Sequence, residues 1–226
     1  MKRATIALCA GSALLLSTAA RAHSVAQVQT AKRISQATVV AQDPRADIDD
    51  AVFESERATG HRNRAIGHML RNHGIIADDP EPALALYFRQ CAIRVTCRDL
   101  AMIGATLAND GRNPLTREQA IAPEHVHHML SVMSSSGMYD FSGEWLYRVG
   151  LPAKSGVGGG ILAVQPGRLA IAVFSPPLDP QGNSVRGVAV CQDLSTELSL
   201  HLFDASQRGT PVVRMFTTRR NVTSKQ

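Results

Sequence analysis

The sequence lacks the features that define several large classes of protein. It has neither a P-loop nor a dinucleotide-binding fingerprint, because the glycine-rich residues 156–160 follow a turn and open a strand-like run, not a helix. It shows no internal repeat and no low-complexity tract. The apolar run from about residue 6 to residue 16 is short and is broken by Gly11 and Ser12, so we expect no stable membrane span.

Positive charge is scarce in the body of the chain, although the 226 residues carry a net charge of +5. Lys2, Arg3 and Arg21 contribute +3 and residues 204–226 contribute +4, which leaves −2 for the residues between them. A folded body with this balance and no basic stripe is a poor nucleic-acid binder, so we expect no nucleic-acid partner. The hydrophobic fraction of 44% is enough for one domain with a sizeable core.

The N-terminus and the cysteines predict different compartments. Residues 1–22 have the layout of a secretory signal, with a basic start, an apolar run and an A-x-A cleavage site, which would make the protein periplasmic or secreted. The alternative is an upstream segment translated from a wrong start. After cleavage an odd number of cysteines would remain, which favours a reducing, cytoplasmic compartment and buried free thiols at Cys91, Cys97 and Cys191.

Hydrophobic periodicity predicts several helices followed by a hairpin and a last helix. We read residues 23–42 as a linker or arm, 43–203 as the folded domain and 204–226 as a basic flexible tail. Helical patterns cover residues 49–74, 78–93, 96–110, 122–137, 142–149 and 185–202. Residues 158–164 and 168–174 predict two antiparallel strands joined by the turn QPGR. This order is α+β and not βαβ alternation.

Two stretches carry candidate chemistry. Residues 151–160 read LPAKSGVGGG, in which Lys154-Ser155-Gly156 resembles the K-T-G strand of serine acyl-transfer enzymes. The glycines indicate close approach of the backbone or positive φ. Glu56 and Asn63 are seven residues apart, so a single helix would place a carboxylate and an amide on one face, where they could grip an α-amino group. A solvated helix surface is the alternative for this pair.

The aromatic residues and histidines indicate a function less clearly than these two stretches do. GMYDFSGEW (137–145) groups Tyr139, Phe141 and Trp145, which are either core residues or part of a site for a small polar ligand. EHVHH (124–128) lacks the H-E-x-x-H order of zinc ligands, so we expect no metal site.

Three long strings resemble the serine-dependent glutaminases, which hydrolyse L-glutamine to L-glutamate and ammonia. The strings are SERATGHRNRAI, LYFRQCAIRVTCRDLAMIGATLANDGRNP and SVMSSSGMYDFSGEWLYRVGLPAKSGVGGGILAVQPGRLAIAVFSPPLDPQGNSVRGV, and the resemblance runs from about Asp43 to Phe203. It implies an α+β, β-lactamase/transpeptidase-like fold with an antiparallel sheet and a helical subdomain. It also implies no cofactor, L-glutamine as the ligand and a homo-oligomer in the intact family.

The resemblance also assigns roles to five residues. Glu56 and Asn63 match the pair that holds the amino-acid end of glutamine, and Tyr87 matches a tyrosine that contacts the substrate. Tyr139 matches the catalytic tyrosine beside the nucleophile, which relays the proton to leaving ammonia. Val157 matches the residue whose backbone N–H helps to form the oxyanion hole, where such a donor is worth about 3–4 kcal/mol.

The sequence departs from the family in one decisive respect. The family's nucleophile and base lie in an S-x-x-K motif, and this motif is absent, because the residues three positions before Lys32, Lys154 and Lys225 are Gln29, Leu151 and Val222. The family's N-A-G-A-type segment and the N-terminal strands of its sheet are absent as well. We therefore expect an open sheet edge and no catalysis by the chain alone.

Three alternatives remain open on the sequence. The chain is a truncated gene product or the result of a wrong gene model, an enzyme completed by a full-length subunit, or a non-catalytic module that binds glutamine.

Overall fold

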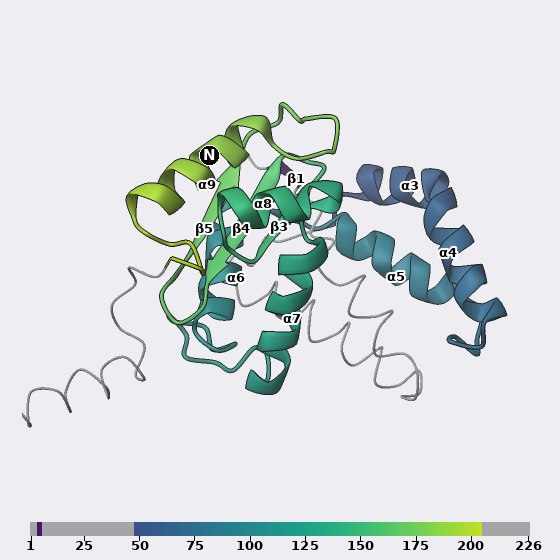
Figure 1. Cartoon of the computed structure of the whole chain (residues 1–226). Helices are drawn as coiled ribbons and strands as arrows, with labels where there is room; N and C mark the ends of the chain where they lie inside the picture. The colour runs from purple at the N-terminus through teal and green to yellow at the C-terminus, as the bar shows by residue number, and fades with distance from the viewer. Residues whose placement is uncertain (1–3, 6–47, 205–226) are drawn as a thin grey trace, which may run out of the picture.

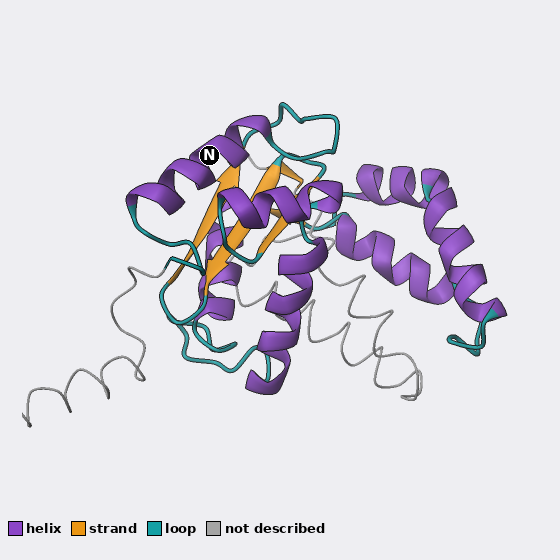
Figure 2. Ribbon diagram, viewed as in Figure 1, coloured by secondary structure: helices purple, strands orange, loops and turns teal. Residues whose placement is uncertain are grey.

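The structure is a computed structural model that describes residues 4–5 and 48–204, and it confirms the α+β class. A small antiparallel sheet lies between helices, with α8 (Ser142–Arg148) and α9 (Val185–Glu197) on one face and α6 (Cys97–Ala108) on the other (Figures 1 and 2). A separate group of three helices lies beside this body (Figure 1): α3 (Asp50–Thr59), α4 (His61–Asn72) and α5 (Glu81–Cys91). This group corresponds to the expected helical subdomain.

The helices follow the predicted order. They are α3 (Asp50–Thr59), α4 (His61–Asn72), α5 (Glu81–Cys91), α6 (Cys97–Ala108), α7 (Pro123–Ser136), the 3₁₀ helix η2 (Tyr139–Phe141), α8 (Ser142–Arg148) and α9 (Val185–Glu197). The last helix ends before the predicted residue 202, because Ser199 takes a φ of 51° and the chain turns back toward α8. The Leu202 N–H then donates to the Gly150 carbonyl at 2.9 Å.

The single helix predicted over residues 49–74 is wrong, because α3 and α4 are separate helices with Gly60 between them. Phe88 of α5 packs against this junction so closely that a Cβ on Gly60 would lie 2.3 Å from its Cζ atom. The absence of a side chain at residue 60 therefore lets α5 approach the junction, and α3 and α4 both pack against α5. Figure 1 shows α4 turning away from the direction of α3.

The strands form an antiparallel sheet in the order β3 (Ala153–Gly156), β4 (Gly160–Gln165), β5 (Leu169–Phe174). A separate pair joins β1 (Ala4–Thr5) to β2 (Arg94–Val95). The predicted hairpin is confirmed: Arg168 N–H donates to the Gln165 carbonyl at 3.1 Å, and Gly167 has a φ of 70°. All six residues of β4 are buried, so β4 is the central strand of the sheet.

Two hydrophobic clusters cover the two faces of the sheet. On one face, Leu162 and Val164 of β4 pack with side chains of α6 and α7, among them Leu107 and Met133. On the other face, a second cluster joins strands β3 and β4 to α8 and α9, and contains Met138, Trp145, Leu151, Ala153, Ile161, Ala163 and Cys191. The helices on both faces therefore hold β3 in place through the central strand.

No disulfide joins the three cysteines in the described ranges, as expected: Cys91 and Cys191 are buried and Cys97 is half-buried. Burial raises the pKa of the Cys191 thiol to about 12, and it also raises the pKa of Cys97. The Cys97 thiol donates to the Ala172 carbonyl at 3.2 Å.

The sequence predicts an open sheet edge, and strand β5 is the place to look for it. In the described part of the chain, β4 is the only strand paired with β5, and the β5 side chains are half-buried or exposed.

No helix among residues 4–5 and 48–204 combines the length and the apolar character that a membrane span requires. Apart from Ala4, Thr5 and Asp204, the signal-like segment, the arm and the basic tail lie outside the described residues.

Gly104→Ala tests the packing of α6 on the sheet, and Gly143→Ala in α8 is its matched control. A Cβ on Gly104 would lie 2.4 Å from Leu162 Cδ1 and 2.6 Å from Ala170 Cβ, whereas one on Gly143 would meet nothing within 4 Å. We expect G104A to lower the free energy of unfolding by about 1–3 kcal/mol and G143A to raise it by up to about 1 kcal/mol. Urea unfolding of both variants measures this, and equal stabilities would contradict the described packing.

Thiol labelling at pH 8 tests the burial of Cys191. The thiolate is the reactive form, so a pKa of about 12 should keep Cys191 unlabelled in the native protein, and unfolding in denaturant should expose it. Because the folded pKa is raised, the associated stability should be constant below pH 9 and fall as the pH rises above it. Site-resolved mass spectrometry reads the labelling, and rapid native labelling of Cys191 would contradict the structure.

Candidate functional site

The backbone of Tyr139 is held in a conformation that is rare for residues other than glycine. Its φ is 55°, and a side chain in this region costs conformational free energy unless the surroundings enforce it. The buried Ser142 hydroxyl supplies that enforcement. It donates to the Tyr139 carbonyl at 2.7 Å and accepts from the Met138 N–H at 3.0 Å.

The end of α7 brings Tyr139 to strand β3. Gly137 follows the last turn of α7, and its carbonyl accepts a hydrogen bond from Ser155 N–H at 2.9 Å. The two backbones are so close that a Cβ on Gly137 would lie 1.8 Å from the Ala153 carbonyl oxygen. Only glycine fits at this position, and Tyr139 follows two residues later.

The Tyr139 side chain lies against the K-S-G stretch. Its hydroxyl donates to the Ser155 carbonyl at 3.3 Å. The Lys154 ammonium lies 4.7 Å from the centre of the tyrosine ring and also donates to the Ser155 carbonyl. Ser155 itself is buried, and its Oγ atom has no hydrogen-bond partner among the described residues.

The predicted set of site residues omitted Lys154 and Ser155, although the sequence signal was present. The K-S-G pattern resembles a K-T-G strand in the sequence. The family resemblance, however, assigns roles to Tyr139 and Val157 and to no residue between them. The structure adds both residues to the site because β3 places them directly beside the Tyr139 hydroxyl.

Val157 occupies the tight turn between β3 and β4. Gly159 N–H donates to the Gly156 carbonyl at 2.9 Å and closes this turn. The Val157 side chain is 55% exposed, and its backbone N–H makes no hydrogen bond within the described residues. The backbone donor predicted for an oxyanion hole is therefore open to a ligand.

Tyr139 and Val157 are neighbours across a third residue, Gly182. A Cβ built on Gly182 would lie 3.6 Å from Tyr139 Cε2 and 3.8 Å from Val157 Cγ1. The glycine run beside Val157 also serves the chain itself, because Gly159 has a φ of 96° and a Cβ there would lie 2.5 Å from the Ser175 carbonyl oxygen. The structure thus brings two of the five predicted residues together.

The other three predicted residues belong to the helices α3 to α5. Glu56 lies on α3 and Asn63 on α4, so the prediction that they share one helical face is wrong, since the chain breaks at Gly60. Both side chains are half-buried. Tyr87, on α5, is half-buried as well, and its ring is tilted against Phe88 with centroids 5.6 Å apart. The two helices that carry Glu56 and Asn63 both pack on the helix that carries Tyr87.

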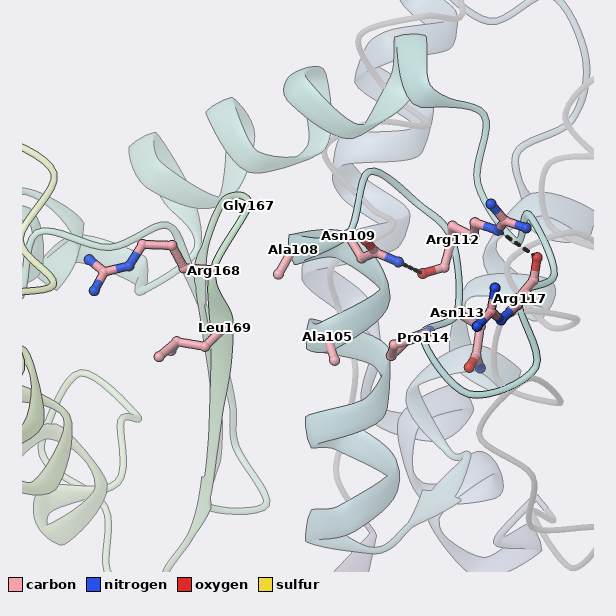
Figure 3. Close-up of a pocket in the computed structure, with 10 residues that line it drawn as sticks. All are labelled: Ala105, Ala108, Asn109, Arg112, Asn113, Pro114, Arg117, Gly167, Arg168 and Leu169. Atoms are coloured by element: carbon pink, nitrogen blue, oxygen red, sulfur yellow. Dashed lines mark hydrogen bonds between the residues drawn. The ribbon is translucent and has the colours of Figure 1, made fainter. Parts of the chain in front are cut away.

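A cavity of about 410 Å³ lies elsewhere, at the C-terminal end of α6 beside the β4–β5 turn (Figure 3). None of the five predicted residues lines it. Its arginines are Arg112, Arg117 and Arg168, and Figure 3 shows Arg168 directed away from the other two. Arg112 Nε donates to the Arg117 carbonyl at 2.8 Å, so this side chain bonds to the backbone of the loop that carries it. The three guanidinium groups therefore do not converge on one ligand.

The histidines that the structure describes form no cluster with other metal ligands. Within the described ranges, no group of three or more His, Cys, Asp or Glu side chains has a geometry that could hold a metal ion.

Comparison with known sequences finds one family. The family model described as Glutaminase matches residues 5–203. The chain is 59% identical over 162 residues to the glutaminase of Nostoc sp. (strain PCC 7120), which covers 72% of this chain and 48% of that protein. It is 55% identical over 159 residues to glutaminase 1 of Bradyrhizobium diazoefficiens, covering 70% of this chain and 26% of that protein. The chain thus spans about half the length of the first relative, or less for the second.

Solved structures of glutaminases also resemble this chain. A structure described as probable glutaminase ybaS superposes with a TM-score of 0.75 at 40% identity, over 87% of this chain and 63% of that one. Bacillus subtilis glutaminase YbgJ, in covalent complex with 5-oxo-L-norleucine, superposes with a TM-score of 0.69 at 35% identity, over 75% of this chain and 60% of that one. At identities of 40% and 35%, these structures resemble the chain in sequence as well as in fold.

Ser142→Ala tests whether Ser142 enforces the conformation of Tyr139. Its loss leaves the Met138 N–H without a partner, so we expect the free energy of unfolding to fall by about 1–3 kcal/mol. Ser131→Ala on the exposed surface of α7 removes only a bond to the His127 carbonyl and should change stability by less than about 0.5 kcal/mol. Thermal melts compare the two variants, and an unchanged melting temperature for S142A would contradict this role.

Proposed function

Because the chain belongs to the glutaminase family, we propose that it forms the part of a glutaminase site that holds L-glutamine and stabilises the transition state of its hydrolysis. The observation that carries the proposal is that the Tyr139 ring edge and the Val157 side chain both face Gly182, with the Tyr139 hydroxyl bonded to strand β3 and the Val157 N–H without a hydrogen bond among the described residues. A proton relay and an oxyanion donor are two of the parts that serine acyl transfer requires.

The proposed reaction has two steps. A serine Oγ attacks the side-chain carbonyl carbon of glutamine, and the Val157 N–H stabilises the oxyanion that develops on the carbonyl oxygen. The carbon–nitrogen bond then breaks, and the proton lost by the serine hydroxyl passes through the Tyr139 hydroxyl to the leaving nitrogen, which departs as ammonia. In the second step water attacks the glutamyl ester, which releases L-glutamate and restores the serine hydroxyl.

Lys154 supports the relay in this proposal. Its ammonium lies against the Tyr139 ring, so it places a positive charge beside the hydroxyl that gives up and regains a proton. The Ser155 carbonyl accepts from both Tyr139 and Lys154, and therefore fixes the two side chains relative to each other.

The helices α3 to α5 hold the amino-acid end of the substrate. Glu56 is a carboxylate suited to the α-ammonium group, with Asn63 and Tyr87 as further polar contacts. Bacillus subtilis YbgJ forms a covalent complex with 5-oxo-L-norleucine, which supports an amino acid with a δ-carbonyl as the ligand class for this chain.

The nucleophile is not supplied by these 226 residues, because they contain no S-x-x-K motif. Without a nucleophile and base, only binding and the oxyanion donor remain, and most of the acceleration is lost. We therefore expect binding of L-glutamine without turnover by the chain alone. In the second candidate function, the chain contributes Tyr139 and Val157 to a site completed by a full-length subunit in a homo-oligomer-like assembly.

Calorimetric titration with L-glutamine, together with an ammonia assay, tests the proposal on the full chain. We expect binding with no ammonia release above background. Glu56→Gln should weaken binding about tenfold by removing a charged partner. Glu54→Gln is the matched control, because Glu54 lies two residues away, is exposed and pairs with Arg57, so it should leave binding unchanged. Absence of binding would contradict the proposal, and ammonia release at the rate of an intact relative would contradict the predicted inactivity.

Mixing with a full-length relative tests the second candidate. That relative should carry Phe in place of the tyrosine that matches Tyr139, so that it is inactive alone. Recovery of ammonia release on addition of this chain, but not of its Tyr139→Phe variant, would show a shared site. No recovery at any ratio would leave the binding module as the function.

A further inference from the structure

The segment from Ser175 to Ser184, which we call the β5–α9 loop, is tied down at both ends. Ser175 N–H donates to the Gly159 carbonyl at 2.9 Å, next to the Val157 turn. The Ser184 hydroxyl donates to the Ser175 carbonyl at 2.8 Å and so closes the loop on itself. The same hydroxyl accepts from Gly187 N–H at 3.1 Å and caps α9. The loop therefore links the Val157 turn to a helix of the core.

Asp179 organises the interior of this loop. Its carboxylate accepts from Asn183 N–H at 2.8 Å, and its own N–H donates to the Asn183 carbonyl at 2.8 Å. The Asp179 carbonyl also accepts from Gly182 N–H at 3.0 Å. These bonds hold Gly182 at a φ of 96°, which residues with a side chain rarely adopt.

Gly182 is the point at which the loop meets the site. It faces the ring edge of Tyr139 and the side chain of Val157, which a Cβ on Gly182 would meet at 3.6 and 3.8 Å. The tyrosine ring is thus bounded by Lys154 over its face and by Gly182 at its edge. A displacement of Gly182 would change the space beside both Tyr139 and Val157 at once.

Asn183 shows that the loop conformation is maintained at a cost. Its side chain is fully buried, and neither its amide nitrogen nor its oxygen has a hydrogen-bond partner among the described residues. Buried polar groups without partners are uncommon and disfavour the folded state.

We propose that Asp179 is a positioning residue, which holds Gly182 against Tyr139 and Val157 and so sets the distance between the tyrosine hydroxyl and the oxyanion donor. This inference rests on the proposed function for its consequence, but the positioning itself does not depend on a ligand. Asp179 contacts neither reacting group. It acts through the backbone of Asn183 and Gly182.

The experiment uses the full chain and compares Asp179→Ala with Asp179→Asn and Gln181→Ala. D179N keeps an acceptor oxygen for the Asn183 N–H, and Gln181 is an exposed neighbour in the same loop. The first readout is the ¹⁵N–¹H spectrum without ligand. We expect D179A to shift the Val157 amide and the Tyr139 resonances while D179N and Q181A leave them in place. Unshifted resonances in D179A would overturn the proposal.

The second readout is calorimetric binding of L-glutamine. We expect D179A to weaken binding about tenfold, which corresponds to one charged hydrogen bond, and D179N to recover most of that loss. If the wild-type chain binds no glutamine, the proposed function fails while the ligand-free spectrum still decides the positioning role. If D179A binds as wild type does, the positioning has no consequence and the inference is overturned.

Gly182→Ala keeps the test decisive if D179A does not fold. The added methyl group meets Tyr139 and Val157 at ordinary contact distances, but the φ of 96° disfavours alanine, so Gly182 should move. We expect the same two sets of resonances to shift, and their constancy in a folded G182A would overturn the proposal.

Discussion

The close approach between the end of α7 and strand β3 is the contact on which the candidate site depends. Gly137 lies so near Ala153 that no side chain can be accommodated, and its carbonyl accepts from the Ser155 N–H. Because Tyr139 follows Gly137 by two residues, this contact determines where the tyrosine hydroxyl reaches β3. A larger residue at 137 would separate the two backbones and remove the Tyr139 hydroxyl from Ser155.

The core supports β3 from the side of α8 and α9. Trp145 Nε1 donates to the Leu151 carbonyl at 2.8 Å, and the Ser195 hydroxyl donates to the Val149 carbonyl at 2.6 Å. Both bonds hold the segment that leads into β3, and both donors are buried. A buried carbonyl without a partner would disfavour the fold, so these side chains stabilise the entry to the strand as well as the hydrophobic cluster around it. Strand β3, which contacts Tyr139, is therefore anchored to the core.

The chain belongs to the glutaminase family, and its sequence contains no S-x-x-K motif. The Lys154 ammonium lies over the Tyr139 ring, and Tyr139 and Val157 both face Gly182. Glu56, Asn63 and Tyr87 belong to a separate group of helices, so the two halves of the proposed site are carried by different structural units.

The sequence by itself determined the features that depend on a few neighbouring residues. The Thr96–Asp99 capping box begins α6, Pro123 and Gly137 bound α7, and residues 165–168 form the hairpin turn, since each of these signals acts within one turn of chain. Its long strings also identified the family. Only the tertiary structure decided the break at Gly60, which depends on Phe88, and the meeting of Gly182 with Tyr139 and Val157. These contacts join residues far apart along the chain, and no local pattern encodes which distant side chain will fill the space beside a glycine.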